Sequence, residues 1–239
     1  MAKIRLFIDH PLAEGQAAPL DGPQAHYLSG VMRLKPGDEI TVFNGRDGAW
    51  SARLLEAGKR GGLVEPLAQV APQRDPPDLW LIFAPIKKAR TDFIVEKAAE
   101  MGAARILPVQ TDFTNSERIR QDRLQAHAVE AAEQCGGTFV PPVADLVPLV
   151  RLLDGWDESR RILWADEAMA GPAQTLAGLP HGSWAILIGP EGGFSDAERA
   201  LLTALPYVSR ISLGPRILRA DTAAVAALAL WQATLGDWQ

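Results

Sequence analysis

From residue 79 onward the sequence alternates between short apolar runs and longer helical patterns, which strongly limits the folds open to this chain. Apolar runs typical of buried strands occur at 79–85, 105–110, 161–166, 183–189 and 207–214. Helical patterns separate them at 91–102, at about 117–133 and at 195–205, and a final apolar helix runs from Ala220 to Leu235. Strands that alternate with helices indicate an α/β fold with a mostly parallel sheet.

The earlier part of the chain follows a different pattern. Short apolar or β-branched runs at 4–8, 39–45, 49–56 and 61–67 are joined by tight turns that contain glycine. This spacing predicts a small β-barrel. The segment APQRDPPD at 71–78 holds three prolines and favours an extended linker. We therefore expect a small β domain over residues 1–72 and an α/β domain over residues 73–239.

Composition narrows the classes of function. Hydrophobic side chains make up 47% of the 239 residues, enough for a large globular core. No apolar run has the length of a signal peptide or a membrane span, so we expect a soluble cytoplasmic protein. Cys135 is the single cysteine and the four histidines are scattered, so no metal site is expected. The whole net charge of −5 belongs to residues 73–239, and binding of nucleic acid would require local basic patches.

The most specific local signal is LIGPEGGFSDAE at 187–198. A strand runs into a Gly-Pro-Glu-Gly-Gly loop, and Ser195 and Glu198 have the spacing of a capping box at the next helix. Glycine lets a ligand approach the backbone closely. The spacing is not that of a phosphate-binding loop, and Glu191 would repel phosphate, so a neutral or cationic ligand suits the loop better. An ordinary strand-to-helix turn is the alternative interpretation.

A second glycine-containing loop lies in SLGPRILRADTAAVAALAL at 212–230, before a helix of small apolar residues. A helix this apolar is buried on most of its surface. The loop carries Arg216 and Arg219, and Asp221 and Thr222 follow where side chains can cap the free backbone N–H groups of a helix. Either arginine alone could be a surface charge, but two of them beside a second glycine loop favour a functional site.

Together the two loops resemble the paired C-terminal motifs of the RsmE family, the bacterial 16S ribosomal RNA uracil-N3 methyltransferases of the SPOUT class. The similarity extends over nearly the whole chain. AHYLSGVMRLKPGDEITVFNG (25–45) is similar to the family's PUA-like segment, and IKKARTDFIVEKAAEMGAARILPV (86–109) is similar to its basic helix. EQCGGTFVP (133–141) is similar to a third family segment.

The resemblance implies a small PUA-like β-barrel followed by a SPOUT-type α/β domain, whose parallel sheet ends in a C-terminal trefoil knot. It further implies a homodimer that acts on 16S ribosomal RNA or the small ribosomal subunit, and S-adenosyl-L-methionine (SAM) as the methyl donor. The residues that match the family's SAM-binding loops are Leu187, Ile188, Gly189, Pro190, Glu191, Gly192, Leu213, Gly214, Ile217, Leu218 and Arg219.

The candidates for contact with RNA are Arg33 and Lys35 in the predicted barrel and Lys87, Lys88, Arg90 and Lys97 around the basic helix, and Arg118, Arg120 and Arg123 form a weaker set. Each is individually better explained as a solvated charge, but the cluster at 87–90 favours contact with phosphates. The chain departs from the family at three places. Asp112-Phe113 replaces a Glu-Arg pair, Gly137 replaces an arginine, and Asp221 replaces a glutamate.

The implied reaction assigns roles to two residues. N3 lies on the Watson–Crick edge of uracil, so the target base must be unpaired or extruded. Arg219 is the candidate for stabilising negative charge on the uracil, and Asp221 either accepts the N3 proton or only caps the helix. A non-catalytic RNA-binding assembly factor with the same fold is the alternative, and a nucleotide-using α/β enzyme is a more distant one.

Overall fold

A computed structural model describes residues 4–58, 60–115, 118–169, 176 and 178–238. The chain forms two compact units. The first consists of Met1–Asp75 together with Ala132–Val140, and the second of Pro76–Ala131 together with Pro141–Gln239. The division therefore falls inside the proline-rich segment 71–78, and a short segment from later in the chain joins the first unit, which the sequence did not indicate.

The first unit is built on a five-stranded sheet in the order β1-β3-β4-β5-β2. Its strands are β1 (Arg5–Phe7), β2 (Ala18–Leu20), β3 (Glu39–Phe43), β4 (Ala49–Gly58) and β5 (Gly61–Ala71). β1 runs parallel to β3, and the other neighbours are antiparallel. The register of the β4–β5 pair shifts at several points, and such irregularities bend long strands.

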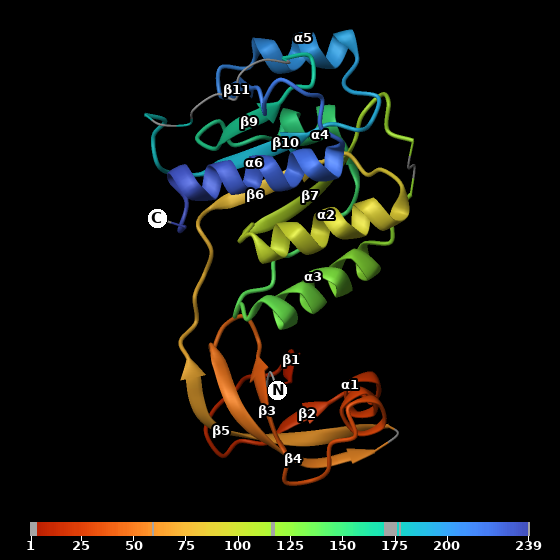
Figure 1. Cartoon of the computed structure of the whole chain (residues 1–239), viewed down its shortest axis with the longest axis vertical. Coiled ribbons are helices and arrows are strands. Elements are labelled where there is room, and N and C mark those ends of the chain that lie inside the picture. Colours follow the sequence, from red (N-terminus) through yellow and green to blue (C-terminus); the bar gives the residue numbers. More distant parts are fainter. Residues whose placement is uncertain (1–3, 59, 116–117, 170–175, 177, 239) are drawn as a thin grey trace. The chain divides into compact units, whose positions relative to one another are not determined.

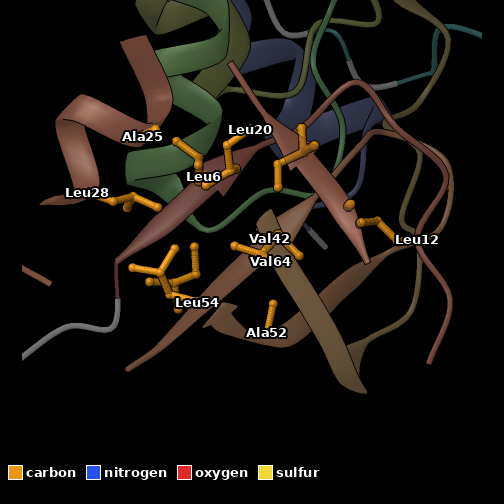
Figure 2. Packing of buried hydrophobic residues seen from close by; sticks show 12 residues of the cluster. Leu6, Leu12, Leu20, Ala25, Leu28, Val42, Ala52, Leu54 and Val64 are labelled. Atoms are coloured by element: carbon orange, nitrogen blue, oxygen red, sulfur yellow. The ribbon is translucent and has the colours of Figure 1, made fainter. Parts of the chain in front are cut away.

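The sheet curls around a large apolar core. Leu6 from edge strand β1 and Leu20 from the opposite edge strand β2 belong to the same cluster of buried side chains, together with Leu54 and Val64. Figure 2 shows these side chains converging from the strands that surround them. Because both edges of the sheet contribute to one core, the unit has the curvature expected of a small β-barrel.

A helical segment in this unit was not expected from the sequence. Helix α1 (Gly22–His26) continues directly into a π-helical turn, η1 (Tyr27–Val31). Asp21 and Gln24 form a capping box at the start of α1. Ala25 and Leu28 are fully buried in the core of the unit, so the segment packs on the sheet through both of its turns.

The end of helix α3 (Gln121–Cys135) and the residues that follow belong to the first unit. The backbone N–H of Phe7 donates to Glu133 Oε1 at 2.8 Å, and the Arg5 guanidinium donates to the Gly137 carbonyl at 2.6 Å. Gly137 is the position at which the family resemblance leads one to expect an arginine. Here its backbone, rather than a side chain, makes the contact with β1.

The second unit contains a six-stranded sheet in the order β11-β9-β10-β6-β7-β8, parallel throughout. The strands are β6 (Leu79–Phe83), β7 (Arg105–Gln110), β8 (Val147–Pro148), β9 (Arg161–Ala165), β10 (Trp184–Ile188) and β11 (Val208–Ile211). Every residue of β10 is buried, as expected for a strand covered on both faces. The predicted parallel α/β sheet is confirmed. The trefoil knot stays a prediction.

Helices cover both faces of this sheet. They are α2 (Lys88–Glu100), α4 (Leu149–Asp154), α5 (Asp196–Ala204) and α6 (Ala220–Leu235). α2 and α6 pack side by side on one face (Figure 1). On the opposite face, Leu153 of α4 and Leu202 of α5 join Trp164 and Leu187 of the sheet in an apolar cluster.

Most element bounds agree with the sequence predictions. β7 and α6 have the predicted bounds, whereas α2 begins at Lys88 instead of Thr91. α3 begins at Gln121, later than predicted, and Glu117, where the prediction began, lies outside the described residues. Strand β8 and helix α4 were not predicted, because both are very short. Within the described ranges, no helix is long and apolar enough to cross a membrane.

The adjacent leucines Leu54 and Leu55 on β4 offer a test of the core of the first unit. Leu54 is fully buried, whereas Leu55 is 39% exposed. We expect Leu54→Ala to lower the free energy of unfolding by about 2–5 kcal/mol, because it leaves a cavity in a packed core. Leu55→Ala, the matched control, should cost less than ~1 kcal/mol. Urea denaturation followed by circular dichroism measures both, and equal losses would contradict this assignment of the core.

Candidate functional site

The carboxyl ends of three neighbouring strands lie at one edge of the parallel sheet. β9 pairs with β10 on one side and with β11 on the other, all in the same direction. Loops that follow parallel strands emerge at the same edge, which is the usual place for a ligand site in such sheets. The segment 165–169 after β9, the loop 189–194 after β10 (the first loop) and the loop 212–219 after β11 (the second loop) therefore meet there.

These segments enclose a cavity of about 230 Å³. A smaller cavity beside it shares several of its lining residues, and we refer to both together as the loop cavity. Of the residues predicted to bind SAM, those that line it are Ile188, Gly189, Pro190, Glu191, Leu213, Gly214, Ile217, Leu218 and Arg219. The two others do not. Leu187 points into the apolar cluster under α4 and α5, and Gly192 lies at the surface beside Phe113.

Packing inside the protein explains the first glycine of the first loop. A Cβ at Gly189 would lie 2.6 Å from the ring of Phe194, which itself packs edge-on against Trp164 at 5.5 Å between ring centroids. The expectation that this glycine leaves room for a ligand is therefore incomplete, because the Phe194 ring needs the space. The predicted capping box is present, with Ser195 Oγ accepting from the Glu198 N–H at 3.3 Å and Glu198 Oε2 accepting from the Ser195 N–H at 2.9 Å.

In the second loop, backbone conformation explains the presence of a glycine. Gly214 has φ of +123°, a value that side-chain-bearing residues rarely adopt, and a Cβ there would meet no other atom. Its N–H donates to Ser212 Oγ at 3.2 Å. Ile217 of the same loop is 75% exposed, unusual for a large apolar side chain. Because Ile217 also lines the loop cavity, a ligand there would cover it.

The start of α6 differs from the prediction in one respect. The capping position is occupied by Arg219, and no side chain caps the helix from there. Asp221 lies within the first turn, where its Oδ1 accepts from the Thr222 N–H at 2.9 Å. Asp221 thus satisfies a free backbone N–H of the helix, but from inside the turn and not from the capping position.

Arg90, on the first turn of α2, joins the two loops. Its Nη1 donates to Glu191 Oε1 at 2.6 Å, and its Nε lies 3.6 Å from Asp221 Oδ2. Glu191 belongs to the first loop and Asp221 follows the second, so one guanidinium links both sides of the loop cavity. The sequence placed Arg90 among the residues that contact RNA, which stays a prediction, and the structure shows that Arg90 also pairs with two carboxylates of the protein.

The segment after β9 contains site residues that the sequence analysis missed. Asp166 is completely buried at its side chain; its Oδ1 accepts from Arg199 at 2.6 Å, and its Oδ2 accepts from Arg210 Nε at 2.8 Å. The neighbouring Glu167 lines the loop cavity and pairs with Arg199. An Asp-Glu pair directly after a buried strand, at the edge where the other two loops were expected, is the signal that could have identified this segment.

These contacts set the charge state of Asp166. Burial of its carboxyl raises the pKa, but hydrogen bonds from Arg199, from the Ala168 N–H and from Arg210 outweigh burial, and the net pKa lies below the ordinary value. The carboxylate is therefore ionised at neutral pH and holds α5 and β11 to the end of β9.

The structure separates the predicted RNA-binding residues into groups. Lys87, Lys88 and Arg90 gather at the start of α2, where both lysines are exposed. Lys97 lies further along α2 and pairs with Glu100 at 2.6 Å. Arg33 belongs to the first unit, where it is exposed and has φ of +58°.

The residues that replace the family's Glu-Arg pair have structural contacts. The Ser195 hydroxyl donates to Asp112 Oδ2, and the Asp112 N–H donates to Glu198 Oε1 at 3.0 Å, so Asp112 fixes the start of α5. Phe113 lies against Gly192, where an added Cβ would come within 3.1 Å of the phenylalanine Cβ. This departure from the family pattern thus supports the first loop.

Comparison with known proteins identifies the family. The RNA methyltransferase domain family matches residues 73–232, and the PUA domain of RNA methyltransferases matches residues 20–67. The ribosomal RNA small subunit methyltransferase E of Rickettsia conorii is 30% identical over 94% of this chain and 93% of its own length. The protein of the same name from Bacillus subtilis is 28% identical over 94% of both chains.

Solved structures agree with these matches. A methyltransferase from Legionella pneumophila in complex with SAM superposes with a TM-score of 0.89 at 28% identity, covering 99% of this chain and all of the other. The ribosomal RNA small subunit methyltransferase E of Neisseria gonorrhoeae, bound to SAM, gives a TM-score of 0.88 at 28% identity with the same coverage.

The fold and the matched domain define the class: this is an RNA methyltransferase with a PUA-like N-terminal part and a SPOUT-type parallel sheet. Within that class, the chain belongs to the ribosomal RNA small subunit methyltransferase E family, RsmE. The resemblance seen in the two loop motifs is thereby confirmed.

Asp166 provides a test of how the site is held together. We expect Asp166→Asn to lower the free energy of unfolding at pH 7 by about 1–2 kcal/mol, since it removes the charge shared by two partly exposed arginines. An unfolded aspartate titrates near pH 4. Because the folded pKa is depressed, the stabilisation is present above about pH 4 and is lost as the pH falls through the folded pKa.

The difference between wild type and Asp166→Asn should therefore shrink in acid, as measured by urea denaturation between pH 7 and pH 3. Asp154→Asn, at an exposed position on α4, is the control and should remain close to wild type throughout. A difference that is constant across this pH range would show that the charge of Asp166 contributes nothing.

Proposed function

We propose that this protein transfers the methyl group of SAM to N3 of a uridine in 16S ribosomal RNA, with SAM held in the loop cavity. The observation that carries the proposal is that the motif residues of both loops, separated in sequence, line one cavity at the carboxyl edge of the sheet. The SAM-bound relatives match over essentially the full chain, which supports the same use of this cavity.

The chemistry of the lining fits SAM. Ile188, Ile217 and Leu218 offer apolar surface for an adenine ring. The lining also holds the carboxylates of Glu167 and Glu191 and the guanidinium groups of Arg216 and Arg219, which suits a ligand that carries charges of both signs, as SAM does. When bound, SAM supplies an electrophilic methyl group on a positively charged sulfur. The protein then has to hold that group in line with the uracil nitrogen and exclude competing geometries.

Arg219 is suited to stabilise the deprotonated uracil. It lines the loop cavity at the start of α6, where the free N–H groups of the helix already carry partial positive charge. Its side chain is exposed and, within the described part of the chain, makes no ion pair or hydrogen bond. Loss of the N3 proton leaves negative charge on the uracil, and a permanently charged guanidinium stabilises that form over the neutral base.

Asp221 is better suited to positioning than to proton transfer. Its Oδ1 accepts from the Thr222 N–H, and its Oδ2 faces Arg90. With both oxygens engaged, Asp221 fixes the start of α6 and, through it, the backbone at Arg219. In this mechanism the N3 proton therefore leaves to solvent.

Three further parts of the proposal follow from the family. The PUA-like first unit, with Arg33, contacts RNA; two copies of the chain act as a homodimer; and the protein works in the cytoplasm, where ribosomal subunits are assembled. The matches of both domains to RNA methyltransferases support the first part. Light scattering coupled to size exclusion would establish the oligomeric state.

The proposed function is tested by incubating the protein with labelled SAM and small ribosomal subunits, or their extracted 16S RNA, from cells that lack it. We expect one labelled nucleotide, identified by mass spectrometry as N3-methyluridine. Binding of SAM and RNA without transfer would favour the alternative, a non-catalytic assembly factor. Binding of ATP or NAD in preference to SAM would contradict both.

Replacement of Arg219 tests its role in catalysis. Arg219→Ala should lower the single-turnover rate of methyl transfer by roughly 10²- to 10³-fold, the scale for loss of one preorganised charge-stabilising donor. SAM affinity should change far less, and the variant's rate should rise more steeply with pH because deprotonated uracil becomes limiting. If Arg219→Ala transfers the methyl group at the wild-type rate when SAM and RNA are saturating, Arg219 is not a catalytic residue.

Replacement of Arg90 distinguishes its two possible roles. If Arg90 fixes the two loops, Arg90→Ala should weaken SAM binding about fivefold in calorimetry without RNA, the worth of a partly exposed ion pair. Lys87→Ala removes a charge from the same turn and should leave SAM affinity unchanged. If Arg90→Ala instead weakens only RNA binding, the original assignment to RNA is right and the bridge between the loops is unimportant.

A further inference from the structure

A second cavity of about 230 Å³ lies in the second unit, between the first turn of α2 and the start of α3. Its lining contains four basic side chains, Lys88, Arg118, Arg120 and Arg123. We refer to it as the basic cavity. A water molecule takes up about 30 Å³ in the liquid, so the space is sufficient for a phosphate group and some waters.

Positive charge prevails in the basic cavity. Arg123 pairs with Asp92, which also lines the cavity, and Arg120 pairs with Asp122 at 2.6 Å. For Lys88 and Arg118 the described part of the chain provides no carboxylate partner. The first turn of α2 also lacks an acidic residue, so the positive end of the helix adds to the same potential.

The basic cavity and the loop cavity lie on different sides of the same helical turn. Lys88, Thr91 and Asp92 are spaced three and four residues apart, which places them on one side of α2, and all three line the basic cavity. Arg90 points from another side of that turn to Glu191 and Asp221 at the loop cavity. The two cavities are therefore separated by about the width of a helix with its side chains, which is 10–12 Å.

We propose that the basic cavity binds a backbone phosphate of the substrate RNA, from a nucleotide that flanks the methylated one. Arginine guanidinium groups match the geometry of phosphate oxygens, and contacts of this kind position RNA without reading its sequence. If the target base lies at the loop cavity, the width of the helix turn is too large for the phosphate of that same nucleotide to reach the basic cavity. Held there, the neighbouring backbone directs an extruded base across the turn towards the loop cavity. The proposal rests on the proposed function, since it takes RNA as the substrate.

The test compares RNA affinity as a function of salt for wild type, Lys88→Ala/Arg118→Ala and Arg151→Ala, with a 16S ribosomal RNA transcript and no SAM. Arg151, exposed on α4, is the control for loss of surface charge. The double variant should bind RNA about tenfold more weakly near 100 mM salt, and the slope of log affinity against log salt should fall by roughly one. SAM affinity should match wild type, and Arg118→Lys in place of alanine should restore part of the RNA affinity.

If the double variant has the same RNA affinity and salt slope as Arg151→Ala, the proposal is overturned.

A second experiment measures thermal unfolding in the presence of inorganic phosphate. If phosphate raises the melting temperature of wild type but not of the double variant, and RNA affinity is unchanged, the cavity takes a free phosphate and the RNA assignment is wrong. If wild type transfers no methyl group, the proposed function is contradicted. If the double variant nevertheless loses RNA affinity, the phosphate site in the basic cavity is still supported.

Discussion

The parallel pairing of β11, β9 and β10 is the constraint on which the site depends. Because neighbouring parallel strands end at the same edge, segments far apart in the chain meet there without any contact encoded in the loops themselves. Asp166 reinforces the arrangement. It lies just after β9, and its buried carboxylate holds Arg199 of α5 and Arg210 of β11, so one side chain connects β11 with the helix that follows β10.

Charged side chains line cavities on two sides of the first turn of α2. On one side, Glu167 and Glu191 line the loop cavity together with Arg216 and Arg219, and Arg90 pairs with Glu191. On another side, Lys88 and Arg118 contribute to a basic lining. Basic side chains can therefore gather locally in a chain whose net charge is −5.

Departures from the family pattern have structural explanations that lie close to the site. Asp112 replaces a family glutamate and holds the start of α5 through Ser195 and Glu198. Phe113 replaces an arginine and packs against the first loop at Gly192. Asp112 and Phe113 therefore support the first loop and the start of α5, which follows it. Lost arginines in this region are balanced, in the proposal made above, by basic side chains at the start of α2 and α3.

The sequence by itself determined the fold class and most residues of the loop cavity. Periodicity defines β7 and α6 to the residue, and the Ser195–Glu198 capping box marks α5, because these signals depend only on residues near one another in the chain. Tertiary structure alone decided that Arg90 joins Glu191 to Asp221 and that Arg118 and Arg123 line one cavity with Lys88. Those contacts depend on the order of strands in the sheet and on the packing of α2, and local sequence carries no signal for either.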